Sequence, residues 1–308
     1  MLNNLMNQNV IDLIEFGLIR VSGKDAKSFL QGQLTCDLEE IKPGRSQFGA
    51  HCDAKARIIA TFRLFFYQNN YYFLLPRSTL PLLLTSLQKY AIFSKVVLLD
   101  VSQNWQKMGI YGPTLKNLFK EQKLSFKENS VLEFNHSLSL SIPGPVPRAI
   151  LLTPTRDYPI NFVENCTEQQ NANNWHLFDI MAGIPTIYPE TSGQFTPQQL
   201  NLPELHAVSF NKGCYIGQEI IARTHYLGKS KSRLYRVGFQ TQSRFLPGAP
   251  LFESNQKIEK GTLIISAKEY ENNYQALVSL QTTAISHTIR MGCPEGPKLD
   301  FLGLPYSN

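Results

Sequence analysis

Alternating apolar and polar residues in the first part of the chain predict β-strands. Residues 16–22 alternate in this way, and residues 57–67 and 71–76, rich in Ile, Phe and Tyr, flank a polar turn. Two such runs around turn residues are typical of a β-hairpin. Residues 79–90 carry apolar side chains at helical spacing, with a proline that the first turn of a helix tolerates. This part of the chain therefore predicts a mixture of strands and helices.

The last quarter of the chain predicts a small β-structure. Its short apolar runs, separated by turn residues, lie at residues 234–239, 261–267, 274–280 and 284–291. Their spacing is typical of a small β-barrel. Before them, residues 175–182 predict a helix that Gly183 ends, because glycine takes the backbone conformation that closes helices. We therefore expect an α+β region over residues 1–228 and a C-terminal β-barrel over residues 229–308.

Composition indicates a globular protein without a membrane segment. The 308 residues are 43% hydrophobic and 18% charged, and no apolar run is long enough to span a bilayer. The N-terminal segment lacks the basic region of a secretory signal. The five cysteines are scattered and include no C-x-x-C pair, which predicts a reducing compartment, no disulfide framework and no metal site. We expect a cytoplasmic protein.

Positive charge gathers in one block. From Ile220 to Phe252 the sequence has no acidic residue. The basic residues of the block are Arg223, Lys229, Lys231, Arg233, Arg236 and Arg244, interleaved with His225, Tyr226 and Tyr235. Such a block can neutralise the phosphates of RNA or the acidic tail of a cofactor. The alternative is a solvated face that keeps the protein in solution. No RNA-binding module signature accompanies the block, so both interpretations stay open.

The residues that suggest chemistry lie between positions 209 and 219. They are Lys212, Gly213, Cys214, Tyr215, Gly217, Gln218 and Glu219. The two glycines that bracket Cys214 predict a tight turn. In an extended segment Lys212 and Cys214 point to one face, and a nearby ammonium lowers the pKa of a thiol. The partial positive charge at the N-terminus of a helix predicted from Gln218 would also lower the pKa of the thiol, whereas the negative charge of Glu219 would raise it. The alternative is a buried, inert cysteine.

These residues carry a family resemblance. The run from Lys212 to Glu219 resembles the K-G-C-Y-x-G-Q-E signature of the YgfZ family. These are folate-binding relatives of the T-protein (aminomethyltransferase) of the glycine cleavage system. Residues 31–37 resemble the family's Q-G-Q-x-T-x-D stretch, and residues 51–55 contain its C-D-x-K stretch. The resemblance covers about residues 15–236.

The resemblance implies a fold and a function. The fold would consist of two interleaved α+β domains of the T-protein type and a C-terminal β-barrel, arranged as a ring with a central channel. The protein would bind tetrahydrofolate and support iron–sulfur enzymes, including those that modify tRNA. Cys214 would be the key thiol and Lys212 would tune it, while Gly213 and Gly217 shape the turn. The residues in support would be Tyr215, Gln218 and Glu219. The implied partners are folate, iron–sulfur proteins or their assembly machinery, and tRNA.

Two aromatic residues occupy the positions that the resemblance assigns to folate. Phe16 begins the first strand, and Trp175 stands at the start of the helix that leads to Gly183. Aromatic walls and a basic mouth suit the flat pterin ring and the glutamate tail of folate. For both aromatic residues the alternative is packing in the hydrophobic core.

One departure from the T-protein pattern concerns catalysis. Where T-proteins carry a pair of aspartates, one of them important for folate-dependent chemistry, this chain has Ala60 and Thr61. Without a carboxylate there, the group that would assist one-carbon transfer is absent. This argues against aminomethyltransferase activity, which is the alternative function. The acidic residue that the family has just before Ala182 is likewise replaced, by Met181.

Overall fold

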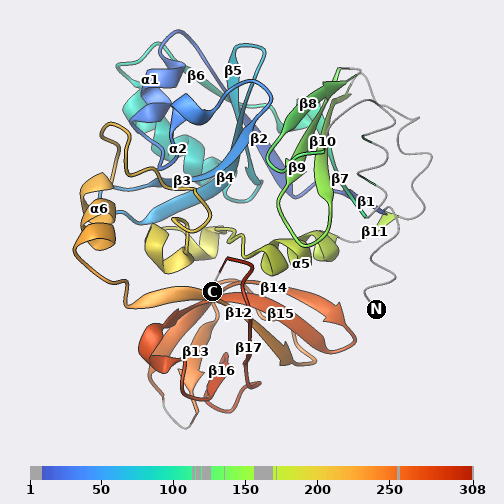
Figure 1. Ribbon diagram of the computed structural model, residues 1–308, viewed down its shortest axis with the longest axis vertical. Coiled ribbons are helices and arrows are strands. Elements are labelled where there is room, and N and C mark those ends of the chain that lie inside the picture. The colour runs from blue at the N-terminus through green and yellow to red at the C-terminus, as the bar shows by residue number, and fades with distance from the viewer. Residues whose placement is uncertain are drawn as a thin grey trace.

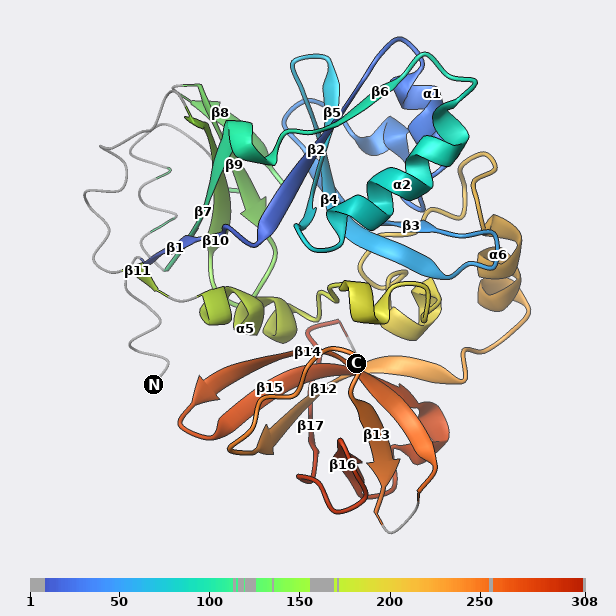
Figure 2. The ribbon, with the colours of Figure 1, turned by 180° about the vertical axis from the view of Figure 1, so that it is seen from behind.

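The computed structural model arranges three β-sheets around a layer of helical segments (Figure 1). It describes residues 9–112, 115, 119, 126–134, 136–155, 169–170, 172–254 and 257–306. Two sheets lie side by side above helix α5 (Ala172–Ala182), and the third lies below it, as the view from behind also shows (Figure 2). The chain is therefore a mixed α/β protein. None of the described helices is both long and apolar enough to cross a membrane.

The first sheet has five antiparallel strands and is buried on both faces. Its order is β3 (Ser46–Cys52), β4 (Ile58–Tyr67), β5 (Asn70–Pro76), β2 (Phe16–Ser22) and β6 (Val97–Asp100). The helices α1 (Ala26–Gln31) and α2 (Leu80–Ala91) pack on one face. Successive side chains of a strand point to opposite faces. Along β4, Phe62 and Leu64 accordingly join the core beneath these helices, whereas Phe65 joins a core on the other side.

The second sheet combines a strand that precedes the first sheet in the sequence with strands that follow it. Its order is β11 (Gln169–Gln170), β1 (Asn9–Asp12), β7 (Trp105–Tyr111), β10 (Arg148–Pro154), β9 (Ser137–Ile142) and β8 (Val131–Phe134). Strand β1 comes before the first sheet in the chain and pairs with β7, which comes after it. The ring with a central channel and the domain division at residue 228 stay predictions.

The third sheet is a curled half-barrel. Its order is β16 (Ile289–Met291), β13 (Pro250–Glu253), β14 (Glu259–Tyr270), β15 (Asn273–Gln281), β12 (Ser232–Gln240) and β17 (Asp300–Leu302). The residues directly before β17 bond to the other edge strand: the Met291 N–H donates to Pro297 O at 3.0 Å, and the Leu299 N–H donates to Ile289 O at 2.9 Å. The structure thus shows the curled sheet, and its closure into a complete β-barrel stays a prediction. The strand predicted over residues 284–291 is shorter, because η7 (Thr282–Ala284) and a turn occupy its beginning.

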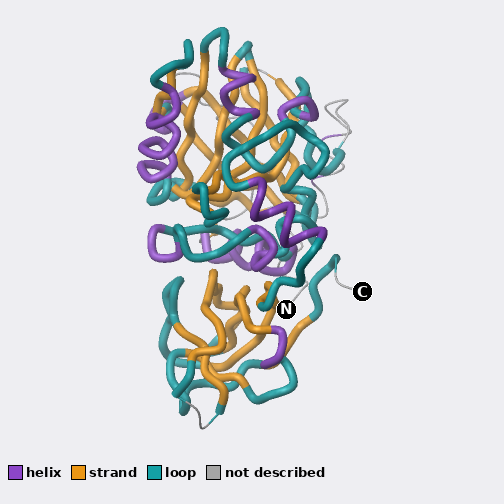
Figure 3. Tube along the Cα trace, turned by 90° about the vertical axis from the view of Figure 1, so that its left-hand side faces the viewer, coloured by secondary structure: helices purple, strands orange, loops and turns teal. Residues whose placement is uncertain are grey.

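The central layer joins the third sheet to the rest of the molecule, as the side view in Figure 3 shows. Besides α5 it includes η5 (Pro189–Thr191) and η6 (Pro197–Leu200). The remaining elements are η2 (Leu38–Glu40), η3 (Ser102–Asn104) and α6 (Gln218–Tyr226). One core cluster contains Ile180 of α5, Leu200 of η6 and Leu277 of the third sheet. Burial of these apolar side chains holds the layers together. Gly183 ends α5 with a φ of 68°, as predicted.

Candidate functional site

The three sequence stretches that carry the family resemblance converge in one place. The backbone N–H of Ser209 donates to Thr35 O at 2.8 Å, and the Thr35 hydroxyl donates to Ala207 O at 2.7 Å. The Ile216 N–H donates to Gly32 O at 3.2 Å, and the Thr35 N–H donates to Ala50 O at 2.9 Å. We call residues 31–37, 50–56 and 207–218 together the motif hub. In the folded chain, the hub brings together three stretches that lie far apart in the sequence.

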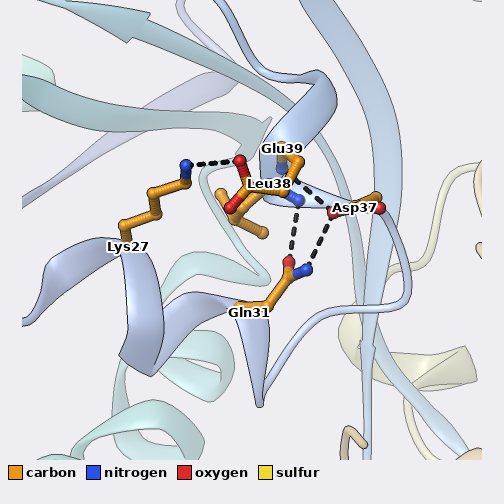
Figure 4. Close-up of polar contacts among 5 residues, drawn as sticks. All are labelled: Lys27, Gln31, Asp37, Leu38 and Glu39. Atoms are coloured by element: carbon orange, nitrogen blue, oxygen red, sulfur yellow. Dashed lines mark hydrogen bonds and ion pairs between the residues drawn. The ribbon is translucent and has the colours of Figure 1, made fainter. Parts of the chain in front are cut away.

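The Gln31–Asp37 stretch is closed by its own side chains (Figure 4). Gln31 Nε2 donates to Asp37 Oδ1 at 2.8 Å, and Gln31 Oε1 accepts from the Leu38 N–H at 2.8 Å. Asp37 Oδ1 also accepts from the Glu39 N–H at 3.0 Å. An exposed ion pair of 2.7 Å between Lys27 and Glu39 ties α1 to the same turn. The loop is thus held in the shape that presents its backbone to residues 207–216.

Of the two glycines that bracket Cys214, only Gly217 is required by the backbone. Its φ is 81°, and a Cβ there would lie 2.8 Å from Asp53 O and 3.0 Å from Ala56 Cα. A Cβ at Gly213 would meet nothing within 4 Å, and its φ is not positive. The backbone geometry therefore requires glycine at position 217, whereas position 213 has room for a side chain.

Lys212 and Cys214 do not share a face. The Lys212 side chain is buried, and its Nζ donates to Leu34 O at 2.9 Å and to Cys36 O at 2.8 Å. The ammonium also lies 4.9 Å from the centroid of the Tyr215 ring. Burial lowers the pKa of Lys212 to about 8. The expected common face with the exposed Cys214 is wrong, because the chain bends from Phe210 to Gly213 instead of running extended.

Cys214 is the accessible thiol of the motif hub. It is exposed, and it lies three residues before Gly217, the N-cap of α6. Cys36 and Cys52 are fully buried in the same hub, and burial raises the pKa of both thiols, that of Cys36 to about 12. These two are therefore protonated at neutral pH and out of contact with solvent. Cys214 is therefore not buried, and its reactivity stays a prediction.

The other residues of the signature mostly support the loop. Tyr215 is buried, and its hydroxyl donates to Ser209 O at 3.4 Å. Gln218 Nε2 donates to Lys212 O at 3.5 Å, and the Gln218 N–H donates to Tyr215 O at 3.1 Å. Glu219 is exposed in the first turn of α6. Tyr215 and Gln218 thus hold the segment that carries Cys214.

Phe16 and Trp175 line one narrow cavity of about 50 Å³. Trp175 is only 1% exposed, and its ring packs so closely on β7 that a Cβ at Gly109 would lie 2.6 Å from Trp175 Cε3. The Arg148 guanidinium lies 5.0 Å from the centroid of the Trp175 ring. Trp175 is therefore both a core residue and a wall of the cavity, whereas Phe16 is half-buried.

Two larger cavities adjoin the narrow one. A cavity of about 590 Å³ shares Phe16 and Pro76 with it and extends to the third sheet. A cavity of about 450 Å³ shares Phe48, Arg63 and Ile184 with it on the other side and reaches residues 209–211 of the motif hub. Cys214 itself lines none of the three cavities.

Comparison with known proteins decides the family. A "tRNA-modifying protein YgfZ" from Hamiltonella defensa is 37% identical over 231 residues, covering 73% of this chain and 68% of the relative. The protein of the same description from Photorhabdus laumondii is 32% identical over 309 residues, covering 97% of this chain and 92% of the relative. This chain belongs to the YgfZ family. A family described as the GCVT N-terminal domain matches residues 6–148.

The YgfZ chain also shares its fold with a solved T-protein. The glycine cleavage system aminomethyltransferase T from Bartonella henselae superposes with a TM-score of 0.77 at 16% identity. The superposition covers 99% of this chain and 88% of that protein. The likeness shows a common fold. The motif hub, with the YgfZ signature at its centre, is built on that fold.

Thr61 is one of the two positions at which the resemblance to T-proteins leads us to expect a carboxylate. Its hydroxyl donates to Pro185 O at 3.3 Å and accepts from the Ile187 N–H at 3.1 Å, and it lines the narrow cavity. Ala60 is buried and joins the core beneath α1 and α2. Thr61 therefore forms hydrogen bonds with the backbone of residues 185–187, and neither Ala60 nor Thr61 provides a carboxyl group.

The sequence analysis missed the charged groups of the cavities. Asp179 lines the narrow cavity and pairs with Arg148 at 2.7 Å, with both side chains buried. Glu15 and His176, 3.3 Å apart, line the larger cavity, where burial raises the pKa of Glu15 and lowers that of His176. A lone carboxylate in the apolar part of a helix was the signal for Asp179. Among the described residues, no group of three or more His, Cys, Asp or Glu side chains is placed to hold a metal ion.

Proposed function

We propose that this chain binds tetrahydrofolate between the first sheet, α5 and the third sheet, and that it supports iron–sulfur enzymes that modify tRNA through Cys214. The observation that carries the proposal is that Phe16 and Trp175, far apart in the sequence, line one cavity. These are the two aromatic positions that the family resemblance assigns to folate.

The sizes and charges of the cavities suit this ligand. About 50 Å³ is too small for a pteridine ring, whereas about 590 Å³ falls within the usual range for ligand sites of roughly 300–1,000 Å³. Phe16 borders both spaces and offers a ring for stacking. Arg77 and Arg244 line the larger cavity and supply positive charge for the carboxylates of the glutamate tail. The larger cavity is therefore the proposed binding site of the cofactor, and Trp175 lines the narrow cavity that adjoins it.

Glu15 and His176 supply the polar groups that orient the ring. When bound, tetrahydrofolate supplies a carrier for one-carbon units. The raised pKa of Glu15 and the lowered pKa of His176 both favour the uncharged forms. A glutamate carboxylate accepts hydrogen bonds, and a neutral imidazole can both donate and accept them, which suits the amide and amine edge of a pterin. These two side chains would fix the orientation of the ring against Phe16.

Tryptophan fluorescence tests the folate site. The chain has two tryptophans, and Trp105 lies in β7 against Tyr67 and Tyr72, outside the three cavities. We expect tetrahydrofolate to quench emission in the Trp105→Phe variant, in which Trp175 remains, and to leave the matched Trp175→Phe variant nearly unchanged. Calorimetry should show weaker binding to Phe16→Ala than to the unchanged protein. Absence of tetrahydrofolate binding by calorimetry would refute the site.

The role of Cys214 is supported by its exposure in the motif hub and by the relatives, which are named tRNA-modifying proteins. In a strain that lacks the gene, we expect Cys214→Ala to fail to restore methylthiolated tRNA. Cys293→Ala is the matched control, because Cys293 is also exposed but lies in the C-terminal part. Full restoration of the modification by Cys214→Ala would show that the thiol is not required.

The alternative function is a folate-dependent aminomethyltransferase. The common fold does not distinguish it from the main proposal, but the absence of a carboxylate at Ala60 and Thr61 weighs against it. We expect no transfer of a one-carbon unit from an aminomethylated lipoyl carrier to tetrahydrofolate. Measurable turnover in that assay would favour the transferase instead.

A further inference from the structure

Helix α6, which follows the signature loop, stands at the outer edge of the molecule (Figures 1 and 2). Of its residues only Ile221 is buried. Tyr226 is 64% exposed and the adjoining Leu227 is 85% exposed. Large side chains so exposed on one short element mark a surface for interaction with another molecule.

The aromatic residues of this surface form a preordered stack. The rings of Phe210 and His225 are nearly parallel, with a 16° angle and centroids 3.8 Å apart. The Tyr226 ring meets both at steep angles, with centroids 6.0 Å from Phe210 and 4.8 Å from His225. His225 and Tyr226 are exposed, so a further flat ring has access to them.

Cations without matching negative charge flank His225 and Tyr226 in the sequence. Arg223, Lys229 and Lys231 are exposed, and none of them has an ion-pair partner among the residues that the structure describes. Arg233, the next cation, is paired with Glu204 at 3.0 Å. Glu219 at the start of α6 is the acidic residue of the helix. The surface therefore has a net positive charge.

We propose that α6 and residues 227–231 bind a single-stranded segment of RNA. Bases would stack on Phe210, His225 and Tyr226, and Arg223 with its neighbouring lysines would contact the phosphates. Stacking on aromatic side chains combined with cations along the strand is how proteins hold single-stranded nucleic acid. A protein partner fits less well, because lysine is depleted in the centres of protein interfaces. The inference goes beyond the proposed function, which requires no direct contact between this chain and RNA.

The test measures the affinity of the full chain for a short fluorescein-labelled single-stranded RNA by anisotropy, over a range of salt concentrations. Tyr226→Ala should weaken binding about tenfold, the loss expected for one stacked base. The combined change Arg223→Gln, Lys229→Gln and Lys231→Gln should lower the slope of log affinity against log salt by about 2, since each phosphate contact contributes about 0.7.

Helix α2 offers the matched controls. Tyr90 is 44% exposed and Lys89 is also exposed, so Tyr90→Ala and Lys89→Gln remove the same groups from another face and should leave the affinity unchanged. Circular dichroism confirms that each variant is folded. Equal loss in the α2 and α6 variants, unchanged affinity in Tyr226→Ala, or tighter binding of duplex than of single-stranded RNA would overturn the proposal. Absence of RNA binding at low salt would also overturn it.

Discussion

The burial of Lys212 predicts how the stability of the protein depends on pH. The folded pKa of Lys212 is about 8, against 10.5 for a free lysine, because burial disfavours the ammonium. This difference corresponds to about 3 kcal/mol that the charged form costs the folded state. Below pH 8 the ammonium is charged in both states and the whole cost applies. The cost falls as the pH rises through 8 and is gone above 10.5.

Replacing Lys212 by Met removes this dependence. For the unchanged protein, Lys212 should contribute a gain of about 1.4 kcal/mol in the free energy of unfolding between pH 7 and pH 9. Other groups that titrate in this range are common to both proteins, so the difference between the two curves isolates Lys212. Urea unfolding followed by circular dichroism, in the presence of a reductant, measures it.

The control is Lys229→Met, because the Lys229 side chain is exposed and its replacement leaves the buried Lys212 in place. Its pH dependence should follow that of the unchanged protein. If Lys212→Met shows the same rise in stability from pH 7 to pH 9 as the unchanged protein, then Lys212 is not the group that titrates. The argument that its ammonium is confined between Leu34 O and Cys36 O would then be wrong.

Three further predictions concern the motif hub and the narrow cavity. Gly217→Ala should lower the free energy of unfolding by about 2 kcal/mol or more, because the positive φ of Gly217 and the Asp53 carbonyl leave no room for a Cβ. Gly213→Ala should change the free energy of unfolding by less than about 0.5 kcal/mol. Urea unfolding of both variants tests this difference. Asp179→Asn leaves a buried guanidinium without its charge partner and should cost about 3–5 kcal/mol in the same assay. At neutral pH iodoacetamide should modify Cys214 and spare the buried Cys36 until the protein unfolds, as peptide mass spectrometry can show.

Strong periodicity allowed several elements of the fold to be predicted. The hairpin β4–β5 and the helix α2 follow the expected ranges within a few residues. Strand β3 was missed, because its sequence Ser-Gln-Phe-Gly-Ala-His-Cys mixes polar and small residues that tertiary contacts bury. His51, for example, is buried with its ring nitrogens bound to Gln33 O and Ser86 Oγ. Partners so distant leave no local signal.

The composition of the site was predicted better than its geometry. The signature identified the loop that carries Cys214, but the direction of Lys212 depends on carbonyls at positions 34 and 36, which no local spacing reveals. The pair of Asp179 with Arg148 was invisible for the same reason, since β10 and α5 meet only in the folded chain. The C-terminal strands were recognised, yet whether a curled sheet closes depends on the pairing of its edges.

The bonds that complete the motif hub join residues very far apart along the polypeptide. Thr35 and Ala207 are separated by 172 positions, and Leu34 and Lys212 by 178. At synthesis rates of about 5–20 residues per second, the first stretch waits roughly 10–40 s for the second to be made. A polypeptide that ends before residue 218 therefore cannot display the finished thiol loop. The exposed sulfur acquires its setting only after more than two thirds of the chain has been made.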